Sequence, residues 1–266
     1  QSLKELAQSP NNWIAINRLL AAGERLSALV VAQRLKEHGI DAHPVGAEDI
    51  GLKLKGINRA PIVDLETSMV ELDRSAFFGT PVITGWFGEG NDGELALLGR
   101  GGSDHTATSI ARLVDADKVI LWKDVDGVLP INPRWGVESS PIPYLGYSEA
   151  VELARLDTPV LHPATVEPLR GIGIPLEIRD LRSVVKDQAA SIIGPDLIQT
   201  HKVKAIGCLP NVTRLTVSSS SLEAQSELLG RVLIGLADEN IACWNLDSIP
   251  GQISWIVSQH DLEKAN

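Results

Sequence analysis

The sequence has little cysteine, few aromatic residues, no excess of positive charge and no long apolar run. Its two cysteines, Cys208 and Cys243, lack the CxxC spacing, which fits a reduced, cytoplasmic compartment. The 24 Lys and Arg against 34 Asp and Glu give a net charge of −10, which argues against nucleic-acid binding because clustered cations must neutralise the phosphates. No apolar run is long enough to span a bilayer and no signal peptide opens the sequence, so we expect no membrane partner.

The remaining composition is typical of a globular protein with a sizeable core. The 266 residues are 44% hydrophobic, which is enough for one larger domain and one small one. The negative net charge would repel an anionic substrate. Such a substrate would therefore need local cations or a metal ion.

Helical and strand-like segments alternate over the first part of the chain. In the first helix, over 24–39, Leu26, Leu29 and Val30 recur near the helical period. Ser103 or Asp104 is the expected N-cap of a second helix. The remaining expected segments are strands at 80–87, 94–98, 118–122 and 174–178 and helices at 105–116 and 148–156. This order predicts an α/β domain with a largely parallel sheet over residues 1–195.

The pattern changes near residues 194–199. The tail reads as strand, helix, strand, strand and the start of a helix, with the expected segments at 213–219, 226–239, 241–246, 252–257 and from 260 onward. We therefore expect a second, smaller α+β domain over residues 196–266. Its β-α-β-β-α order lacks a final strand, so we expect this domain to be incomplete.

A glycine-rich loop between an expected strand and an expected helix is the first candidate site. It reads GRGGSD, from Gly99 to Asp104. Backbone N–H groups at a helix start attract anions, and glycines let a ligand come close to them. Arg100 adds a planar fork for a carboxylate or phosphate, and Asp104 could receive an ammonium or stand behind a metal ion. The alternative is a turn in which Arg100 and Asp104 pair with each other or with solvent.

A second candidate site follows the expected strand at 118–122. It reads WKDVDGVLPINPR and begins where ligands bind in open α/β sheets. Lys123 and Arg134 could meet phosphate oxygens, and Asp124 and Asp126 could contact a nucleotide or a metal ion. The alternative is a polar turn with the common Asp-Gly dipeptide at its tip.

Four further residues are weaker candidates. Glu24 stands at the start of the expected helix 24–39, where a carboxylate often only compensates the helix dipole. His162 could be catalytic, although a histidine that fixes a turn is the simpler interpretation. For His105 we expect a solvated or capping role, and for Trp86 a packing role.

Taken in order, these segments resemble the aspartate kinases of the amino acid kinase family. The resemblance spans residues 23–193 and rests on the segments GERLSA, TPVITGWFG, LLGRGGSDHTATSIA, VILWKDVDGVLPINPR, SEAVELA and VLHPAT. It implies a three-layer sandwich with a mainly parallel sheet. The tail more weakly resembles the ferredoxin-like ACT regulatory module of such kinases.

The resemblance also implies an activity. Aspartate kinases transfer the γ-phosphoryl group of ATP, with Mg²⁺, to the side-chain carboxylate of L-aspartate, giving 4-phospho-L-aspartate, the first step of lysine, threonine and methionine biosynthesis. ACT modules imply a homo-oligomer and an amino-acid effector. The implied aspartate-binding residues are Glu24, Arg100, Gly101, Gly102, Ser103 and Asp104, with Arg100 and Asp104 catalytic; the implied nucleotide-binding residues are Lys123, Asp124, Leu129 and Arg134.

Three departures from the family pattern leave an alternative open. The family opens with a strand and a lysine-bearing glycine loop, whereas this sequence begins QSLKELAQ. Pro159 replaces a lysine common before VLHP, and Asn132 replaces an aspartate. The chain is therefore interpreted either as part of an aspartate kinase or as a degenerate member of the family that binds an amino acid without catalysis. A kinase of the same fold with another acid as acceptor is a third hypothesis, which the ACT-like tail disfavours.

Overall fold

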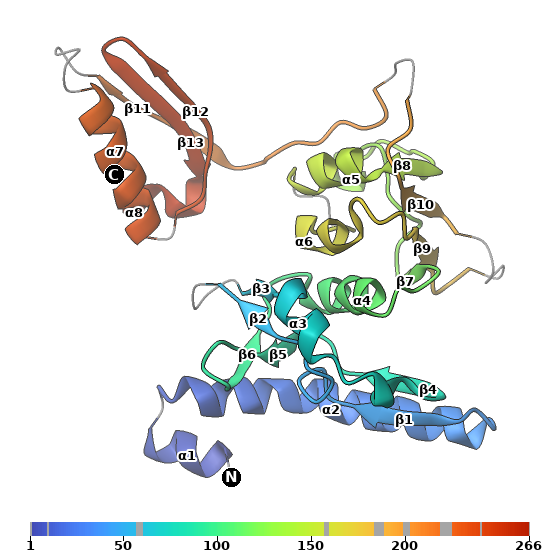
Figure 1. The fold of residues 1–266 in the computed structure, drawn as a ribbon. Coiled ribbons are helices and arrows are strands. Elements are labelled where there is room, and N and C mark those ends of the chain that lie inside the picture. The colour runs from blue at the N-terminus through green and yellow to red at the C-terminus, as the bar shows by residue number, and fades with distance from the viewer. Residues whose placement is uncertain are drawn as a thin grey trace. The chain divides into compact units, whose positions relative to one another are not determined.

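The computed structural model describes residues 2–9, 11–56, 61–156, 160–183, 189–198, 203–218, 225–239 and 241–265 (Figure 1). The chain forms two compact units, residues 1–207 and 208–266, which are described separately. No helix in the described ranges is both long enough and apolar enough to cross a bilayer.

The first unit contains short helices and strands in alternation. Its helices are α1 Ser2–Gln8, α2 Trp13–Glu37, α3 Leu65–Glu71, α4 Gly102–Leu113, α5 Tyr147–Ala154 and α6 Pro163–Val166, with 3-10 turns η1 Arg74–Phe77, η2 Pro133–Trp135 and η3 Glu167–Leu169. Its strands are β1 Ala42–Val45, β2 Leu54–Lys55, β3 Ile62–Val63, β4 Thr80–Ile83, β5 Phe87–Glu89, β6 Leu95–Leu97, β7 Val119–Lys123, β8 Tyr144–Gly146, β9 Leu176–Asp180 and β10 Ser191–Gly194.

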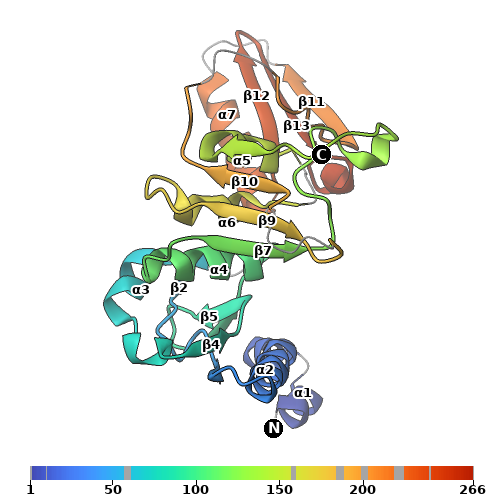
Figure 2. The ribbon, with the colours of Figure 1, turned by 90° about the vertical axis from the view of Figure 1, so that its right-hand side faces the viewer.

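The strands of this unit pair mostly in parallel within the larger sheet. Four strands pair in the order β7-β9-β10-β8, with β7 and β9 parallel, β10 and β8 parallel, and β9 and β10 antiparallel. Figure 2 shows β7, β9 and β10 side by side. A separate pair, β1 and β4, is also parallel. The pairs β2–β3 and β5–β6 are antiparallel. The predicted α/β class with a mainly parallel sheet is confirmed.

Helix α4 connects the two hydrophobic cores of the first unit. Ala111 belongs to the core that surrounds β7, β8, β9 and β10, whereas Leu113 belongs to the core under β2, β3 and the loop after β1. Figure 1 shows α4 between these two groups of strands. The loop that precedes α4 is therefore anchored to both halves of the unit.

Three predicted boundaries in this unit are wrong. Helix α2 begins at Trp13 rather than Glu24, because Asn12 caps it by accepting a hydrogen bond from the backbone N–H of Ala15 at 3.2 Å. The expected strand 80–87 breaks into β4 and β5 at Trp86, which has a φ of 72°. Helix α4 begins at Gly102, so its N-cap is Gly101 rather than Ser103 or Asp104.

The N-cap of α4 follows from the conformation that the loop requires. Gly101 has a φ of 73°, in the left-handed region that favours glycine. A Cβ added to Gly101 would lie 2.7 Å from the Cβ of His162. A helix capped by the side chain of Ser103 or Asp104 would begin later in the sequence. Helix α4 instead begins at Gly102, directly after Gly101, and has no side-chain cap.

The second unit is a three-stranded antiparallel sheet with helices. Its elements are β11 Val212–Ser218, α7 Gln225–Asp238, β12 Cys243–Ile249, β13 Gln252–Ser258, η4 Gln259–Asp261 and α8 Leu262–Ala265, and the strand order is β11-β13-β12. Ile253, Trp255 and Val257 on β13 form its core with Leu236 of α7. The predicted β-α-β-β-α order is confirmed.

The two units divide after Gly207, whereas the sequence predicts a boundary after residue 195. Residues 204–206 still belong to the first unit through specific contacts. The backbone N–H of Ile206 donates to the carbonyl oxygen of Pro130 at 2.8 Å, and Lys204 Nζ lies 2.7 Å from a carboxylate oxygen of Glu149. These contacts join segments far apart in the sequence, so composition alone does not reveal them.

Candidate functional site

The glycine loop opens onto a cavity of about 570 Å³ in the first unit. One wall comes from α2, a second from the loop and first turn of α4, and a third from the end of β7. The residues that line the cavity are Glu24, Trp86, Leu98, Gly99, Arg100, Gly101, Gly102, Ser103, Asp104 and Lys123. Together with Trp86, which lies between β4 and β5, these three segments meet at one cavity although they are far apart in the sequence.

Seven of the ten predicted site residues line this cavity, and three do not. Those that line it are Glu24, Arg100, Gly101, Gly102, Ser103, Asp104 and Lys123. Asp124, Leu129 and Arg134 follow Lys123 along the segment after β7 and are not part of the cavity wall. Asp124 and Arg134 are exposed to solvent.

The loop glycines are required by close packing. A Cβ on Gly102 would lie 2.6 Å from the Cβ of Leu98 and 2.7 Å from Cδ1 of Trp86. The backbone N–H of Gly102 donates to the carbonyl oxygen of Gly99 at 3.1 Å, which closes the turn. Gly102 therefore shapes the loop, and its N–H is already engaged by the loop itself.

The first turn of α4 offers backbone donors at the cavity. Within the described part of the chain, no acceptor is assigned to the N–H groups of Ser103 and Asp104, as expected for the first turn of a helix. Both residues line the cavity. The positive end of the helix dipole reinforces these donors, so this wall favours a negatively charged group.

Opposite charges are balanced across the cavity. Lys123 Nζ lies 2.5 Å from Oδ2 of Asp104, and both side chains are about three-quarters or more buried, at 25% and 20% exposure. Glu24 and Arg100 are the other charged residues of the lining. The lining thus carries two acidic and two basic side chains and suits a ligand with charges of both signs.

Trp86 is a cavity residue that the sequence indicated only as a packing residue. The backbone of Trp86 has a φ of 72°, which a non-glycine residue rarely adopts. Two hydrogen bonds stabilise it: the Trp86 N–H donates to the Thr106 hydroxyl at 3.1 Å, and its carbonyl accepts from the Leu98 N–H at 2.7 Å. Such strained backbone is concentrated at functional sites, where the surroundings hold it in place.

The two histidines near the loop have structural contacts. The predicted turn-fixing role of His162 is confirmed, because its Nδ1 accepts from the Ala164 N–H at 3.2 Å. The predicted solvated or capping role of His105 is wrong: it is buried, with Nε2 accepting from the Val63 N–H at 3.1 Å and Nδ1 2.5 Å from the carbonyl oxygen of Ala164. Burial lowers the pKa of both histidines, and for His162 the positive charge of Arg100 lowers the pKa further.

The comparisons with known proteins agree with this architecture. Residues 3–180 match the model of the amino acid kinase family. The chain belongs to this family. It is 31% identical to aspartokinase 2 of Bacillus subtilis over 88% of the chain and 56% of that protein, and 32% identical to the chloroplastic aspartokinase 1 of Arabidopsis thaliana over 80% of the chain and 38% of that protein. The chain thus spans about half the length, or less, of these relatives.

A solved structure supports the fold over both units of the chain. The crystal structure of E. coli aspartokinase III in complex with aspartate and ADP, in the R-state, covers 96% of this chain with a TM-score of 0.80 at 25% identity, and the chain covers 57% of that structure. The predicted resemblance to aspartate kinases and the predicted amino acid kinase fold are confirmed.

Beyond the cavity, the sequence of this member of the amino acid kinase family did not reveal one further cation. Arg182 follows β9 and contacts Asp126 at 3.0 Å and Asp180 at 3.0 Å, next to the predicted nucleotide segment. Arg182 and Asp126 are 56 positions apart, and only the parallel pairing of β7 with β9 brings them together. Pro159, which the sequence analysis singled out, lies outside the described residues.

Proposed function

We propose that the chain carries aspartate kinase activity and transfers the γ-phosphoryl group of ATP to the side-chain carboxylate of L-aspartate. The observation that carries this proposal is the meeting of Glu24, Arg100, the first turn of α4 and Lys123 at one cavity. The similarity to aspartokinases and to a structure holding aspartate and ADP supports it.

In this proposal the amino acid binds through its two charged ends. The Glu24 carboxylate accepts hydrogen bonds from the ammonium, and the Arg100 guanidinium donates to a carboxylate. The N–H groups of Ser103 and Asp104 face the transferring group, where negative charge gathers. Phosphoryl transfer depends mainly on positioning and charge neutralisation, and these groups supply both.

The nucleotide lies toward β7 in this proposal. Lys123 exchanges its contact with Asp104 for a phosphate oxygen, and Asp104 then orients the surrounding donors. Asp124, Leu129 and Arg134 extend this side of the site along the segment after β7. The exposed positions of Asp124 and Arg134 suit a nucleotide bound at the surface.

Magnesium fits this site as an ion that enters with ATP. The described residues contain no group of three or more His, Cys, Asp or Glu side chains arranged to hold a metal ion. Mg²⁺ in kinases is commonly bound by one or two carboxylates together with substrate phosphates, and Asp104 is the carboxylate at the end of the cavity near Lys123. When bound, the ion neutralises charge on the phosphates.

A second candidate function is amino-acid binding without catalysis. The charge balance of the cavity favours it, because Glu24 and Asp104 offset Arg100 and Lys123 and a zwitterion needs no further cation. In either case we propose that the second unit is an ACT-like module that pairs copies of the chain and binds an amino-acid effector. A cytoplasmic location stays a prediction.

The decisive experiment measures the acyl phosphate product directly. The protein is incubated with ATP, Mg²⁺ and L-aspartate, and aspartyl phosphate is trapped with hydroxylamine as the hydroxamate. We expect hydroxamate with L-aspartate and none with N-acetylglutamate. Aspartate binding by calorimetry without hydroxamate would establish the second candidate function, and the absence of both would refute the assignment.

The substitution Arg100→Gln tests the substrate contact. Loss of a hydrogen-bonded charged contact should weaken L-aspartate binding by about 1.5–3 kcal/mol, which is roughly tenfold to a hundredfold in Kd. The matched control is Arg155→Gln, which removes an arginine from an exposed ion pair with Glu152 on α5. Calorimetric titration of both variants gives the comparison, and equal affinities would remove Arg100 from the site.

A further inference from the structure

The loop before α4 packs against a histidine that does not line the substrate cavity. The three atoms nearest to a Cβ built on Gly101 all belong to His162: its Cβ at 2.7 Å, its Cγ at 3.1 Å and its Nδ1 at 3.7 Å. His162 is the N-cap of α6 and is not among the residues of the cavity wall, whereas Gly101 is. His162 can therefore act on the site through the backbone of Gly101.

The first turn of α6 fixes the side chain of His162. Its Nδ1 accepts from the Ala164 N–H at 3.2 Å, and its carbonyl oxygen accepts from the Thr165 N–H at 2.9 Å. A ring nitrogen of histidine accepts a hydrogen bond only when the imidazole is neutral. Burial, and in addition the positive charge of Arg100, lower the pKa of His162, which keeps the ring neutral at pH 7.

Helix α4 in turn holds the peptide group to which His162 is bonded. The buried ring of His105 accepts from the Val63 N–H at Nε2, so its Nδ1 carries the proton and donates to the carbonyl oxygen of Ala164 at 2.5 Å. Ala164 thus bridges the two histidines. The circuit closes at the start of α4, where the backbone N–H of His105 donates to the carbonyl oxygen of Gly101 at 2.9 Å.

The neighbouring glycine of the loop is confined by a separate contact. A Cβ on Gly102 would lie 2.7 Å from Cδ1 of Trp86. Trp86 is itself tied to α4, because its N–H donates to the Thr106 hydroxyl, which donates to the carbonyl oxygen of Gly102 at 2.9 Å. The turn therefore lacks room toward Trp86, and the contact with His162 limits the movement that remains.

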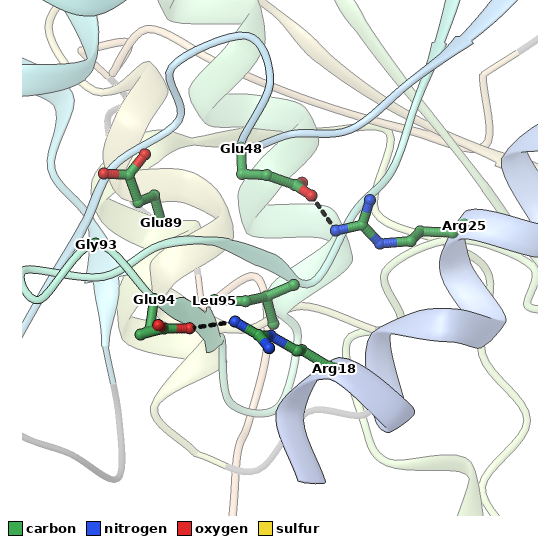
Figure 3. A pocket seen from close by; sticks show the side chains of 7 residues that line it. All are labelled: Arg18, Arg25, Glu48, Glu89, Gly93, Glu94 and Leu95. Carbon is green, nitrogen blue, oxygen red and sulfur yellow. Dashed lines mark hydrogen bonds and ion pairs between the residues drawn. The ribbon is translucent and has the colours of Figure 1, made fainter. Parts of the chain in front are cut away.

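The opposite charge of the site, on Glu24, is held without His162. Glu24 lies on α2, which is joined to other segments of the first unit by ion pairs. Figure 3 shows two of them, Arg18 with Glu94 and Arg25 with Glu48. A change at His162 should therefore disturb the side of the site that carries Arg100 and leave the Glu24 side in place.

We propose that His162 is a positioning residue of the substrate site, which holds Gly101 so that Arg100 and the first-turn N–H groups of α4 face the bound amino acid. The proposal rests on the proposed function, because its ligand is the L-aspartate of that site. His162 does not touch this ligand. It acts by restricting the turn before the ligand arrives, which lowers the entropy that the turn loses on binding.

The first test measures the turn and needs no ligand. His162→Ala removes the cap of α6 together with Cγ and Nδ1, whereas His162→Asn keeps a Cγ and an oxygen that accepts from the Ala164 N–H, as asparagine does at N-caps. The N–H groups of Gly102 and His105 are hydrogen-bonded within the turn. We expect their hydrogen exchange to be about tenfold faster in His162→Ala and nearly unchanged in His162→Asn.

The second test measures the coupling between His162 and Arg100. In calorimetric titrations, His162→Ala should weaken L-aspartate binding about tenfold, both in the otherwise unchanged protein and in a Glu24→Gln background. In an Arg100→Gln background the loss should be about threefold or less, because the contact that His162 positions is already absent. His162→Asn should restore the affinity.

Tyr147→Phe is the matched control for a loss of stability without a change of the turn. It removes a buried hydrogen bond of the first unit, from the Tyr147 hydroxyl to the carbonyl oxygen of Ile174 at 2.6 Å, and Tyr147 is not part of the cavity wall. Exchange in the turn and L-aspartate affinity should both be unchanged in this variant.

Two results would overturn the positioning role of His162. One is unchanged hydrogen exchange of Gly102 and His105 in His162→Ala. The other is an equal loss of L-aspartate affinity with and without Arg100. If the unchanged protein binds no L-aspartate, the proposed function is wrong, and the exchange rates still decide whether His162 holds the turn.

Discussion

Two glycines of the loop before α4 differ in what a methyl group would meet. At Gly102 an added Cβ would come within 2.6 Å of Leu98 and 2.7 Å of Trp86, whereas at Gly99 nothing lies within 4 Å. Gly102→Ala should therefore destabilise the protein by about 1–3 kcal/mol through overpacking. Gly99→Ala is the matched control, with an expected change near zero. Urea denaturation followed by circular dichroism gives the free energy of unfolding of both variants. Equal stabilities would show that the loop accommodates the extra methyl group at Gly102 without cost.

The buried His105 should make stability depend on pH. Burial lowers its folded-state pKa below the ordinary 6.5, so between these two values the unfolded chain binds more protons than the folded one. Stability is then full above pH 6.5 and decreases as the pH falls through this window, by at most about 1.4 kcal/mol per pH unit for one group. His162 acts with the same sign, because its pKa is also lowered.

Urea denaturation at several pH values between 7 and 5 tests this effect. The carboxyl groups with lowered pKa, such as Asp64, titrate from 3.8 downward and lie below the window. In His105→Gln we expect a shallower dependence, because only His162 remains of the two histidines. An unchanged slope in this variant would show that His105 does not produce the effect.

At the scale of the element, α2 shows that hydrophobic periodicity predicts the presence of a helix more reliably than it predicts which face of the helix is buried. Leu26, Leu29 and Val30 recur near the helical period, yet all three are exposed, and α2 instead buries Ala15, Ala21, Ala28 and Ala32. Small side chains bring the helix close to β1 and β4, beside which it lies in Figure 1. Hydrophobicity alone ranks leucine above alanine, so the sequence identified the helix but not the side that packs.

The alanine face of α2 predicts a large loss of stability for one substitution and a small change for another of similar size. Ala32 is 1% exposed, so Ala32→Leu should force the helix away from the sheet and cost about 1–3 kcal/mol. Leu29 on the same helix is 53% exposed, so Leu29→Ala should change stability by only about 0.5 kcal/mol or less. Denaturation midpoints of the two variants decide the matter. A larger loss for Leu29→Ala would mean that the leucine face is covered in solution.

The candidate site was predictable where its residues are close in the sequence. For the GRGGSD loop and for Lys123 the charge and glycine patterns allow either a ligand site or a polar turn, and the structure brings both segments to one cavity. Trp86 and Arg182 were not predictable in the same way. Their roles depend on a strained backbone held by Thr106 and on the pairing of β7 with β9, and no local pattern encodes these tertiary contacts.

At the scale of the whole molecule, the sequence pattern does not give the position at which the two units divide. The change of pattern near residues 194–199 precedes the second unit, which begins at Cys208. It does not locate the division after Gly207, because the intervening segment has no regular structure in its described part and belongs to the first unit only through contacts such as Lys204 with Glu149. Long-range ion pairs of this kind leave no periodic signal in the sequence.

The second unit should pair with another copy of the chain through β11. In the order β11-β13-β12 both outer strands have a free edge within the described residues, but they differ in regularity. Strand β12 has a register shift between Trp244 and Asp247, whereas β11 pairs with β13 without interruption over seven residues. Bulges and charges protect edges from association, so the regular β11 edge is the better surface for a second copy.

Sedimentation velocity over a range of concentrations measures this association. We expect a dimer, and Thr216→Lys, at an exposed position in the middle of β11, should weaken it about tenfold because two lysines would meet across the paired edges. The matched control is Asp247→Lys at an exposed position on β12, which should leave the dimer unchanged. A chain that stays monomeric at every concentration, or that loses its dimer equally in both variants, would show that β11 is not the interface.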